Sequence, residues 1–278
     1  MGFPYKTVLM VGCTAGLGVA MAERMVENGS FVIAVGRRKD RLDAFAARHG
    51  GPGGGKVAVS QFDITDLDGI RPWAEGIVRD HPTLDCVVLN AGIQRSLDFT
   101  RPAAIDLALV RQETDTNYTA YIALLAALLP HLQARGADAD ADAGPAAVVA
   151  VSSGLALVPL PRCANYCGTK AALHALMWSL RAQLGADPGS RHIKVIEIVP
   201  PAVQTELHEL QADLRAAGQA HIGITIEEYM QDCWAGLERG DEEILVGPIK
   251  TNFANLEDGR RAMFERFWSA MSAGKLPT

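Results

Sequence analysis

Short runs of β-branched residues alternate with longer amphipathic stretches through about residue 200 of this 278-residue chain, and this alternation constrains the fold most strongly. Such a rhythm indicates βαβ units, hence a parallel sheet covered by helices on both faces. The segment 86–89, Cys-Val-Val-Leu, is apolar without alternation, as expected of a strand buried on both faces. The sequence therefore predicts an α/β fold: a doubly wound parallel sheet of about seven strands.

The expected elements follow the chain in order. We expect strands at 7–11, 31–35, 56–61, 85–89, 146–151, 193–199 and 242–246. We expect helices at 17–28, 39–49, 66–80, 163–184 and 256–271, and a long helical region at 102–133.

Two segments interrupt this rhythm. Residues 136–145 alternate Ala and Asp without an apolar face, which predicts a solvated loop. Residues 202–225 mix leucines with polar residues and glycines, and long excursions of this kind often form lids or binding loops. We find no repeat and no linker, so the expectation is a single domain over 1–278 with a substrate lid at 202–225.

Composition excludes several classes of protein. With 26 basic and 32 acidic residues the net charge is −6, which argues against a nucleic-acid binder. No apolar run approaches the ~18 residues that a membrane span needs, and residues 1–6 have no apolar signal core. We therefore expect a cytoplasmic protein without nucleic-acid or membrane partners. The five cysteines are expected to be reduced, buried thiols, and no histidine or acidic pair completes a metal site beside them.

A glycine-rich loop lies between the first expected strand and the first expected helix. Gly12, Gly16 and Gly18 have the spacing G-x-x-x-G-x-G. Glycines at this position permit a tight turn and the close approach of backbone to a pyrophosphate at a helix N-terminus. Glycine also serves plain turn geometry, but the placement between strand and helix favours nucleotide binding.

Three cations follow the second expected strand, where an NAD site would carry an acidic residue for the ribose. Arg37, Arg38 and Lys39 oppose the helix dipole, which favours anions at a helix N-terminus. Asp40 and Asp43 could offset this charge. A 2′-phosphate held by Arg37 and Arg38 explains the cluster better, so we predict NADPH rather than NADH as cofactor.

Further motifs follow in a fixed order. They are Asp63, Asn90-Ala91-Gly92, Asn117, Ser152-Ser153, Tyr166-Cys167-Gly168-Thr169-Lys170 and Pro200-Pro201-Ala202-Val203-Gln204-Thr205. In this order, with the glycine loop, the sequence resembles a short-chain dehydrogenase/reductase of the single-domain type over about residues 7–207. The resemblance implies a Rossmann-like fold, an oxidoreductase activity and NADP(H) as cofactor. The chain departs from the family's usual pattern at Val11 and Pro201, neither of which touches the reacting atoms.

The resemblance also implies the residues of the cofactor site. Thr14 and the backbone of Leu17 would contact phosphates, and Asp63 with the backbone of Ile64 would hold the adenine. The adenine ribose would lie against the Asn90-Ala91-Gly92 turn, and the nicotinamide carboxamide against Val203 and Thr205. The full set implied is Gly12, Thr14, Gly16, Leu17, Gly18, Arg37, Arg38, Asp63, Ile64, Asn90, Ala91, Gly92, Tyr166, Lys170, Val203 and Thr205.

Four residues carry the expected chemistry. Tyr166 and Lys170 lie four apart on a predicted helix and so share a face. A nearby ammonium favours the tyrosinate and brings the phenol pKa down from about 10, which makes Tyr166 a usable general acid. Ser153, preferred to Ser152 because it precedes Tyr166 by the interval usual in the family, would donate a hydrogen bond to the substrate oxygen. The resemblance implies that Asn117 anchors a water linking Lys170 to solvent.

Each of these residues has a plainer explanation when taken alone. The tyrosine ring could fill the core, the lysine could be a solvated helix charge, and the asparagine could cap or kink the long helical region. Their joint occurrence at the family's intervals favours the catalytic interpretation.

The substrate side is apolar. Leu155 follows the expected catalytic serine, and Leu207 and Leu210 recur in the lid. Apolar walls with few polar anchors suit the carbonyl of a hydrophobic ketone or aldehyde. We therefore predict an NADPH-dependent carbonyl reductase that forms a homodimer or homotetramer. The alternatives are an NADP(H)-binding regulatory protein that has lost turnover, and a reductase of an imine or conjugated alkene.

Overall fold

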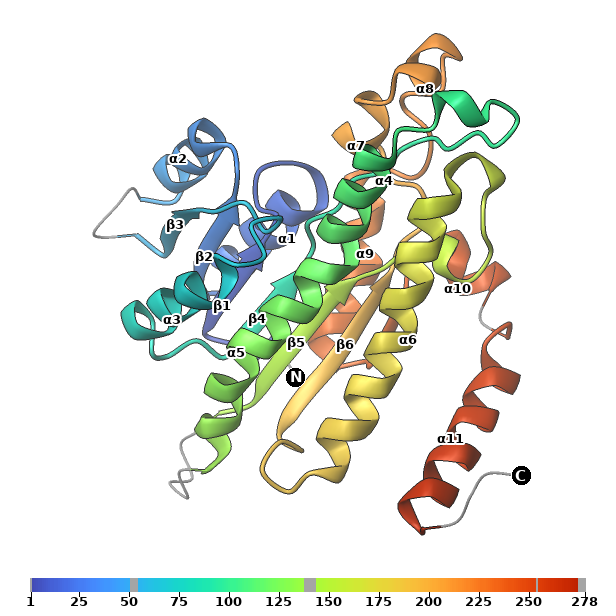
Figure 1. The fold of residues 1–278 in the computed structure, drawn as a ribbon. Coiled ribbons are helices and arrows are strands. Elements are labelled where there is room, and N and C mark those ends of the chain that lie inside the picture. The colour runs from blue at the N-terminus through green and yellow to red at the C-terminus, as the bar shows by residue number, and fades with distance from the viewer. Residues whose placement is uncertain (1, 51–54, 138–143, 254, 275–278) are drawn as a thin grey trace.

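A computed structural model describes residues 2–50, 55–137, 144–253 and 255–274. In this part of the chain seven parallel strands form one sheet in the order β3-β2-β1-β4-β5-β6-β7 (Figure 1). The strands are β1 Thr7–Val11, β2 Phe31–Gly36, β3 Val57–Gln61, β4 Cys86–Leu89, β5 Ala146–Val151, β6 Ile193–Val199 and β7 Glu243–Leu245. The predicted doubly wound parallel α/β sheet is confirmed.

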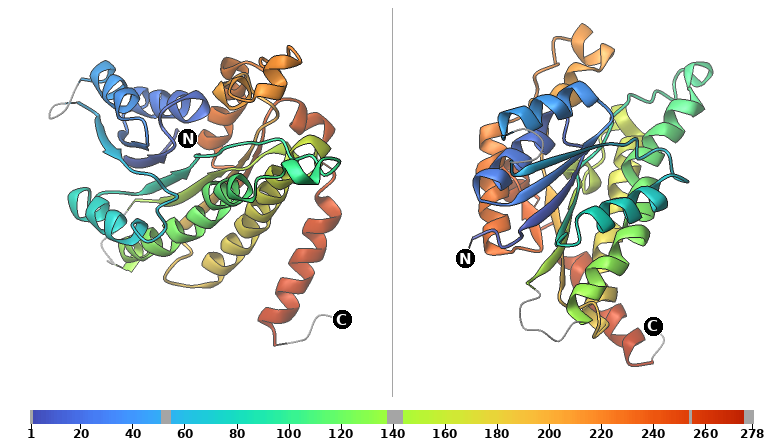
Figure 2. Two further views of the ribbon diagram at one scale, coloured as in Figure 1. Left: turned by 45° about the horizontal axis from the view of Figure 1, so that its top comes forward. Right: turned by 90° about the vertical axis from the view of Figure 1, so that its left-hand side faces the viewer.

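Helices cover both faces of the sheet (Figure 2). One layer contains α1 (Gly16–Glu27), α2 (Lys39–Arg48) and α9 (Ile226–Arg239), and the other contains α3 (Ile70–Asp80), α5 (Ala120–Ala137) and α6 (Ala164–Ala186). Strand β1 explains why both layers form. Val8 and Met10 pack into one hydrophobic core, whereas Leu9 and Val11 pack into the other, because successive side chains of a strand point to opposite faces.

The long helical region predicted at 102–133 consists of four elements in the structure. A 3₁₀ turn, η1 (Pro102–Ala104), precedes α4 (Leu107–Thr114), a π-helical turn, η2 (Asp115–Thr119), and α5. The Asp106 carboxylate accepts hydrogen bonds from the amides of Ala108 and Leu109 and so fixes the start of α4. Residues 107–137 are helical without a gap, so the long helical region that the sequence predicts is confirmed there, and only its first residues form a separate 3₁₀ turn.

Other boundaries differ less. Helix α3 begins at Ile70 rather than at 66, because the Asp66 carboxylate accepts from the amide of Gly69 and holds a turn. Helix α5 extends to Ala137, so the loop predicted at 136–145 is shorter at its start, and residues 138–143 lie outside the described residues. After β7 come α10 (Pro248–Asn252) and α11 (Asp258–Ser272).

The segment 202–225 contains two short helices, α7 (Glu206–Glu209) and α8 (Ala212–Ala216). A bridge between Val203 and Ile224 joins its two ends. The segment then leads directly into α9, whose start is fixed by a capping box between Thr225 and Glu228. No helix among the described residues has the length and apolar character needed to cross a membrane.

Candidate active site

The candidate residues gather at the carboxyl edge of the sheet. Chain order reverses between β1 and β4, and ligands of open α/β sheets bind outside the carboxyl ends of the strands at such a switch point. Helices α7 and α8 lie beyond this edge, above β5 and β6 (Figure 1). The loop segments that follow β1, β2, β4, β5 and β6 therefore face a common space.

The glycine loop after β1 is shaped for close approach of backbone. Gly12 has φ +93°, and a Cβ there would lie 2.7 Å from the Ala91 backbone. A Cβ on Gly18 would lie 2.1 Å from the carbonyl oxygen of Gly12 and 2.5 Å from the side-chain nitrogen Nδ2 of Asn90. Only glycine fits at these two positions, so the loop forms the cradle that a pyrophosphate at the N-terminus of α1 requires.

The cation cluster after β2 is built around Thr14. Arg38 donates to the Thr14 hydroxyl from Nε at 3.2 Å and from Nη2 at 2.8 Å. Arg41, which the sequence analysis did not single out, donates from Nη1 to the Thr14 carbonyl at 3.3 Å. Two guanidinium groups and a hydroxyl thus converge beside the glycine loop, a donor set that fits a phosphate.

Arg38 and Arg41 also bind a carboxylate of the lid. Arg38 Nη1 lies 2.8 Å from Glu206 Oε2, and Arg41 forms an ion pair with the other oxygen of Glu206. Both arginines hold the pKa of Glu206 below its usual value, against the opposing effect of partial burial. Glu206 was not among the predicted site residues, since nothing local in the sequence pairs it with residues 165 and 168 positions earlier.

Arg37 lies apart from this cluster. Its Nη1 is 3.6 Å from Asp63 Oδ2, and both side chains are about half exposed. The other Asp63 oxygen accepts from the amide and the hydroxyl of Thr65, at 3.0 and 2.8 Å. The structure therefore brings Arg37 to Asp63, the residue predicted to hold the adenine, and brings Arg38 to the candidate phosphate site.

The Asn90-Ala91-Gly92 turn after β4 lies between the glycine loop and the candidate residues Asn117 and Lys170. Asn90 Nδ2 donates to the Gly12 carbonyl at 3.1 Å. A Cβ on Gly92 would lie 3.5 Å from Asn117 Oδ1 and 3.8 Å from Lys170 Nζ. This turn thus contacts the glycine loop at Asn90 and lies close to Asn117 and Lys170 at Gly92.

Tyr166 and Lys170 occupy adjacent turns of α6, and both side chains are buried. Lys170 Nζ lies 5.7 Å from the centroid of the Tyr166 ring and donates to the Val151 carbonyl at 2.8 Å. Val151 is the last residue of β5. The end of one strand therefore fixes the ammonium beside the phenol.

The two serines after β5 have different roles. Ser152 Oγ donates to the Ile198 carbonyl within the sheet at 3.3 Å. Ser153 Oγ accepts from the amide of Leu155 at 3.1 Å, at the start of the 3₁₀ turn η3 (Gly154–Ala156). Against the larger effect of burial, the Ser153 hydroxyl also lowers the pKa of Tyr166. This geometry favours Ser153 over Ser152 as the serine of the site.

Asn117 lies in the π-helical turn and is completely buried. Its Oδ1 accepts from the amide of Ile93 at 2.9 Å, while its Nδ2 donates to the Ile93 carbonyl at 2.9 Å and to the Thr169 hydroxyl at 3.1 Å. A π turn inserted into a helix is frequently found at functional sites. Here it turns the Asn117 amide toward Ile93, in the loop after β4, and toward Thr169 of α6.

Burial dominates the electrostatics of the pair. Burial raises the pKa of Tyr166 well above its usual value, and the Ser153 hydroxyl only partly offsets this effect. The lowered phenol pKa that the sequence predicts from the nearby Lys170 ammonium is therefore wrong for this structure. Burial lowers the pKa of Lys170 to about 8, against the opposing charge of Glu197. Tyr166 is therefore held as the neutral, proton-carrying phenol, and the Lys170 ammonium becomes titratable close to neutral pH.

The predicted substrate residues divide into two groups. Leu155 is half-buried and packs against the cluster of Cys163, Tyr166 and Cys167, and Leu207 is half-buried in α7. Leu210, in contrast, is 68% exposed. All five cysteines are buried free thiols, as predicted.

Side-chain hydrogen bonds of Gln211, a residue not predicted for the site, attach the segment 202–225 to the rest of the molecule. Gln211 Nε2 donates to Gln94 Oε1 at 2.9 Å, and Arg162 Nη2 donates to Gln211 Oε1 at 2.6 Å. These residues come from the lid, from the loop after β4 and from the turn before α6. Their partners lie 49 and 117 positions away in the chain, so no local pattern could have marked them.

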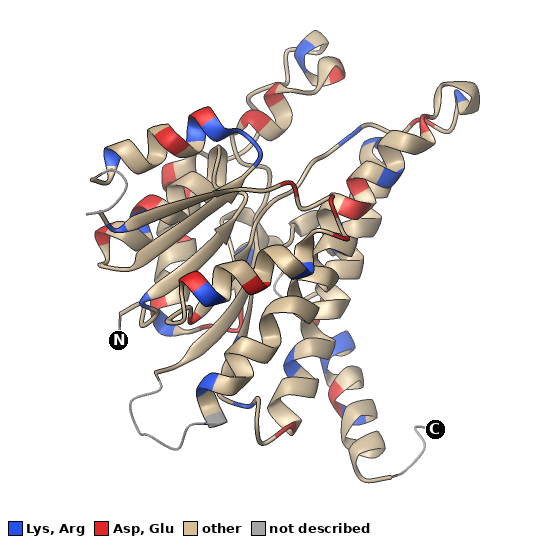
Figure 3. Ribbon diagram, turned by 60° about the vertical axis from the view of Figure 1, so that its left-hand side comes forward, with Lys and Arg blue, Asp and Glu red and all other residues tan. Residues whose placement is uncertain are grey.

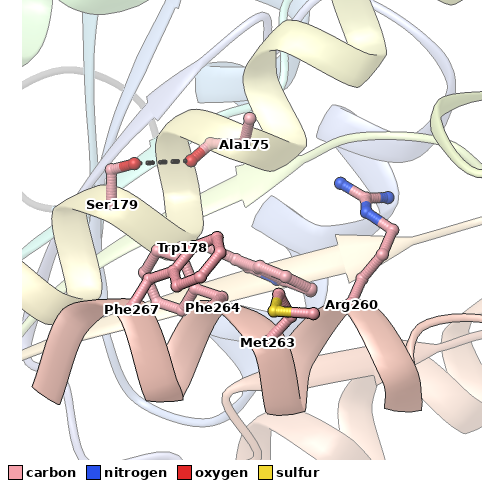
Figure 4. Close-up of a pocket in the computed structure, with 7 residues that line it drawn as sticks. All are labelled: Ala175, Trp178, Ser179, Arg260, Met263, Phe264 and Phe267. Atoms are coloured by element: carbon pink, nitrogen blue, oxygen red, sulfur yellow. Dashed lines mark hydrogen bonds between the residues drawn. The ribbon is translucent and has the colours of Figure 1, made fainter. Parts of the chain in front are cut away.

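A groove of about 310 Å³ lies elsewhere, between α6 and α11 (Figure 4). Its lining includes Trp178 and Phe267, and Ala175 on α6 is more than two turns beyond Tyr166. This groove is therefore separate from the Tyr166 site.

Comparison with known proteins identifies the family. Residues 6–215 match the family model described as short chain dehydrogenase. The chain is 34% identical over 267 residues to an uncharacterized oxidoreductase, DltE, of Bacillus subtilis, with 96% of each chain covered.

Two solved structures show the same fold. A short-chain dehydrogenase of Burkholderia cenocepacia in complex with NADP is 26% identical, with a TM-score of 0.72, covering 96% of this chain and 98% of its own. One of Sphingobium yanoikuyae in complex with NADPH is 25% identical, also with a TM-score of 0.72, covering 96% of this chain and 95% of its own. These matches agree with the sheet order, the glycine loop and the Tyr166–Lys170 pair described above. The chain therefore belongs to the short-chain dehydrogenase/reductase family, whose members are oxidoreductases.

Proposed function

We propose that this protein is a single-domain, NADPH-dependent reductase that converts the carbonyl of a hydrophobic ketone or aldehyde to an alcohol. The observation that carries the proposal is the fixed position of the Lys170 ammonium beside the buried Tyr166 phenol, with the Ser153 hydroxyl as a partner of that phenol. The NADP and NADPH complexes of the two related structures support the choice of cofactor.

The residues present fit an NADP(H) molecule. The Gly12 and Gly18 positions leave no room for a side chain beside the backbone, and Arg38, Arg41 and Thr14 converge as donors. In the proposed site, Arg38 and Arg41 hold the 2′-phosphate and Arg37 lies with Asp63 at the adenine. The cofactor, when bound, supplies the hydride.

Reduction of a carbonyl also needs a proton and stabilisation of the developing alkoxide. Tyr166 carries its phenolic proton and gives it to the substrate oxygen, while Ser153 donates a hydrogen bond to the same oxygen. The tyrosinate that remains is stabilised by the Lys170 ammonium. Asn117 fixes the loop after β4 against α6, the helix of Tyr166 and Lys170, through its three hydrogen bonds to Ile93 and Thr169.

The lid supplies the apolar wall of the proposed site. Leu155 packs next to Tyr166 and is half-buried, and Leu207 in α7 is half-buried as well. Apolar lining of this kind suits a hydrophobic carbonyl compound.

The test is a panel of ketones and aldehydes assayed in parallel with NADPH and NADH, with product identification by mass spectrometry. We expect oxidation of NADPH coupled to formation of an alcohol for at least one apolar carbonyl compound, and loss of that turnover in Tyr166→Phe. Binding of NADPH without turnover of any panel member would favour a regulatory protein. Turnover confined to imines or conjugated alkenes would replace the carbonyl assignment.

We further propose that the protein self-associates through α5 and α6. On the outer face of α5 the exposed residues include Ile122, Ala126 and Pro130, spaced four apart, and the middle of this helix is uncharged (Figure 3). On α6 the exposed residues include Ala171 and Ala175. Small, uncharged faces allow close helix packing, and light scattering of the purified protein, with Ala126→Glu as the disrupting variant, tests the proposal.

A further inference from the structure

A buried charged cluster lies directly behind Lys170. One turn further along α6, His174 Nδ1 lies 2.9 Å from both carboxylate oxygens of Glu197 in β6. On its other side, His174 Nε2 lies 3.1 Å from Glu257 Oε2, at the start of α11. His174 is 1% exposed and Glu197 is completely buried.

The geometry defines the charge of His174. A neutral imidazole has one N–H and one lone pair, whereas here both ring nitrogens face carboxylate oxygens. Only the imidazolium donates a hydrogen bond on both sides. Burial by itself lowers the pKa of His174, but Glu197 and Glu257 outweigh it and raise the pKa above its usual value.

The other charged groups around the cluster have partners of their own. Arg260 Nη1 binds the second oxygen of Glu257 at 2.8 Å, at the solvent-exposed rim. Glu243 of β7 is bound by Arg261 at 2.5 Å and by the indole N–H of Trp178 at 2.7 Å, and Arg181 lies 3.8 Å from it. Within the cluster, Glu257 is thus shared between His174 and Arg260, whereas the completely buried Glu197 has His174 as its ion-pair partner.

Lys170 is the buried cation one turn before His174 on α6. The hydrogen bond of its ammonium goes to the Val151 carbonyl, which is neutral. Glu197 lies beside the same strand, since it pairs in register with Ala150, the residue before Val151. Among the charged groups around Lys170, Glu197 is the one that raises its pKa, opposing the effect of burial.

We propose that Glu197 is a positioning residue for the catalytic step: it is held ionised by His174, and its buried charge keeps Lys170 protonated beside Tyr166. The proposal rests on the proposed function, because it assigns Glu197 a role in supporting the Tyr166–Lys170 pair. Glu257 acts on Glu197 only through His174, so it contributes mainly to the attachment of α11.

The direct test measures the ionisation of Lys170 and needs no substrate. NMR of ¹³C-lysine-labelled protein, with Lys170→Met to assign the signal, gives the titration midpoint of Lys170. In Glu197→Gln, which keeps the shape of the side chain, we expect this midpoint to fall by about one pH unit, which corresponds to the loss of ~1.4 kcal/mol of interaction with a buried unit charge. Glu257→Gln is the matched control and should move the midpoint by less than half as much.

The same variants have a readout in catalysis. If the ammonium is required, activity is lost as pH rises through the pKa of Lys170, so the alkaline limb of the kcat profile in Glu197→Gln should shift to lower pH. At pH values below that limb, kcat should approach that of the unmodified enzyme. A Lys170 midpoint that is equal in Glu197→Gln and in the unmodified protein would overturn the proposal, even if carbonyl reduction is confirmed.

A measurement on the unmodified protein covers the case in which Glu197→Gln does not fold. ¹⁵N NMR of the histidine side chains should show both nitrogens of His174 protonated at pH 7, with His174→Gln assigning the signal. A neutral His174 tautomer at this pH would contradict the proposal. If no carbonyl compound is reduced, the proposed function fails while the Lys170 and His174 titrations still decide whether Glu197 controls this lysine.

Discussion

Lys170 Nζ lies 5.7 Å from the ring centroid of Tyr166 and 2.8 Å from the Val151 carbonyl oxygen, so the end of β5 fixes the ammonium beside the phenol. A flexible lysine would spend only part of its time at this position. The carbonyl and the burial of the side chain remove that freedom, and the charge is then in place before a proton leaves Tyr166.

Tyr166→Phe removes only the phenolic hydroxyl. Because a positioned general acid is lost, we expect kcat to fall by roughly 10²–10⁴, with the dissociation constant for NADPH changed little. Tyr229→Phe is the matched control, since it removes another buried hydroxyl, whose partner is the Met21 sulfur on the opposite face of the sheet. Equal activities of the two variants would exclude Tyr166 as the proton donor.

Arg38→Gln tests the choice of cofactor. Charge-assisted hydrogen bonds are worth ~1.5–3 kcal/mol each, so the dissociation constant for NADPH should rise tenfold or more while that for NADH changes little. Lys39→Gln is the control, because Lys39 is exposed and pairs with Asp43. Fluorescence titration measures both constants. Equal affinities of the unmodified protein for NADPH and NADH would contradict the phosphate site.

Glu206→Gln tests whether the lid carboxylate competes with the cofactor phosphate. Glu206 binds both Arg38 and Arg41, so removing its charge should leave these cations free for the 2′-phosphate and lower the dissociation constant for NADPH several-fold. The dissociation constant for NADH, which has no 2′-phosphate, should stay unchanged. Glu209→Gln, which changes the same helix but removes a pair with the exposed His221, should leave both constants unchanged. Weaker NADPH binding in Glu206→Gln would show that Glu206 supports the site instead.

Hydrogen exchange tests the lid. We expect amides at 206–218 to exchange faster than those of β5 and β6 in the free protein, and to become protected with NADPH and substrate. Leu207→Ala should raise KM, whereas Leu210→Ala, at a 68% exposed position, should not. Strong protection of 206–218 without ligands, unchanged when they bind, would identify ordinary packed structure.

Gly18→Ala tests the cradle. The new methyl group would lie 2.1 Å from the Gly12 carbonyl oxygen, so we expect a loss of about 1–3 kcal/mol in the free energy of unfolding and weaker NADPH binding. At Gly185, in α6, nothing lies within 4 Å of a Cβ, and Gly185→Ala should stabilise the protein by up to about 1 kcal/mol. Denaturant unfolding of the two variants measures both effects.

The sequence determined the features that depend on local pattern. Burial on both faces of a strand leaves an uninterrupted apolar run, and burial on one face of a helix leaves a 3.6-residue period, so the strands and most helices were predictable to within a few residues. The four-residue interval between Tyr166 and Lys170 placed them on one helix face for the same reason. The tight loop at Gly12 and Gly18 was predictable because glycine is the residue that fits where backbone comes too close for a side chain.

Only the tertiary structure decided the contacts between distant segments. The π turn between α4 and α5 carries Asn117, whose amide is bound to Ile93, 24 positions earlier. The Arg38–Glu206 pair spans 168 positions, and the His174–Glu257 contact spans 83. A carboxylate has the same local sequence signature whether it is solvated, binds an arginine or faces a buried imidazolium. Which of these occurs depends on what the packing of the sheet and helices places opposite it.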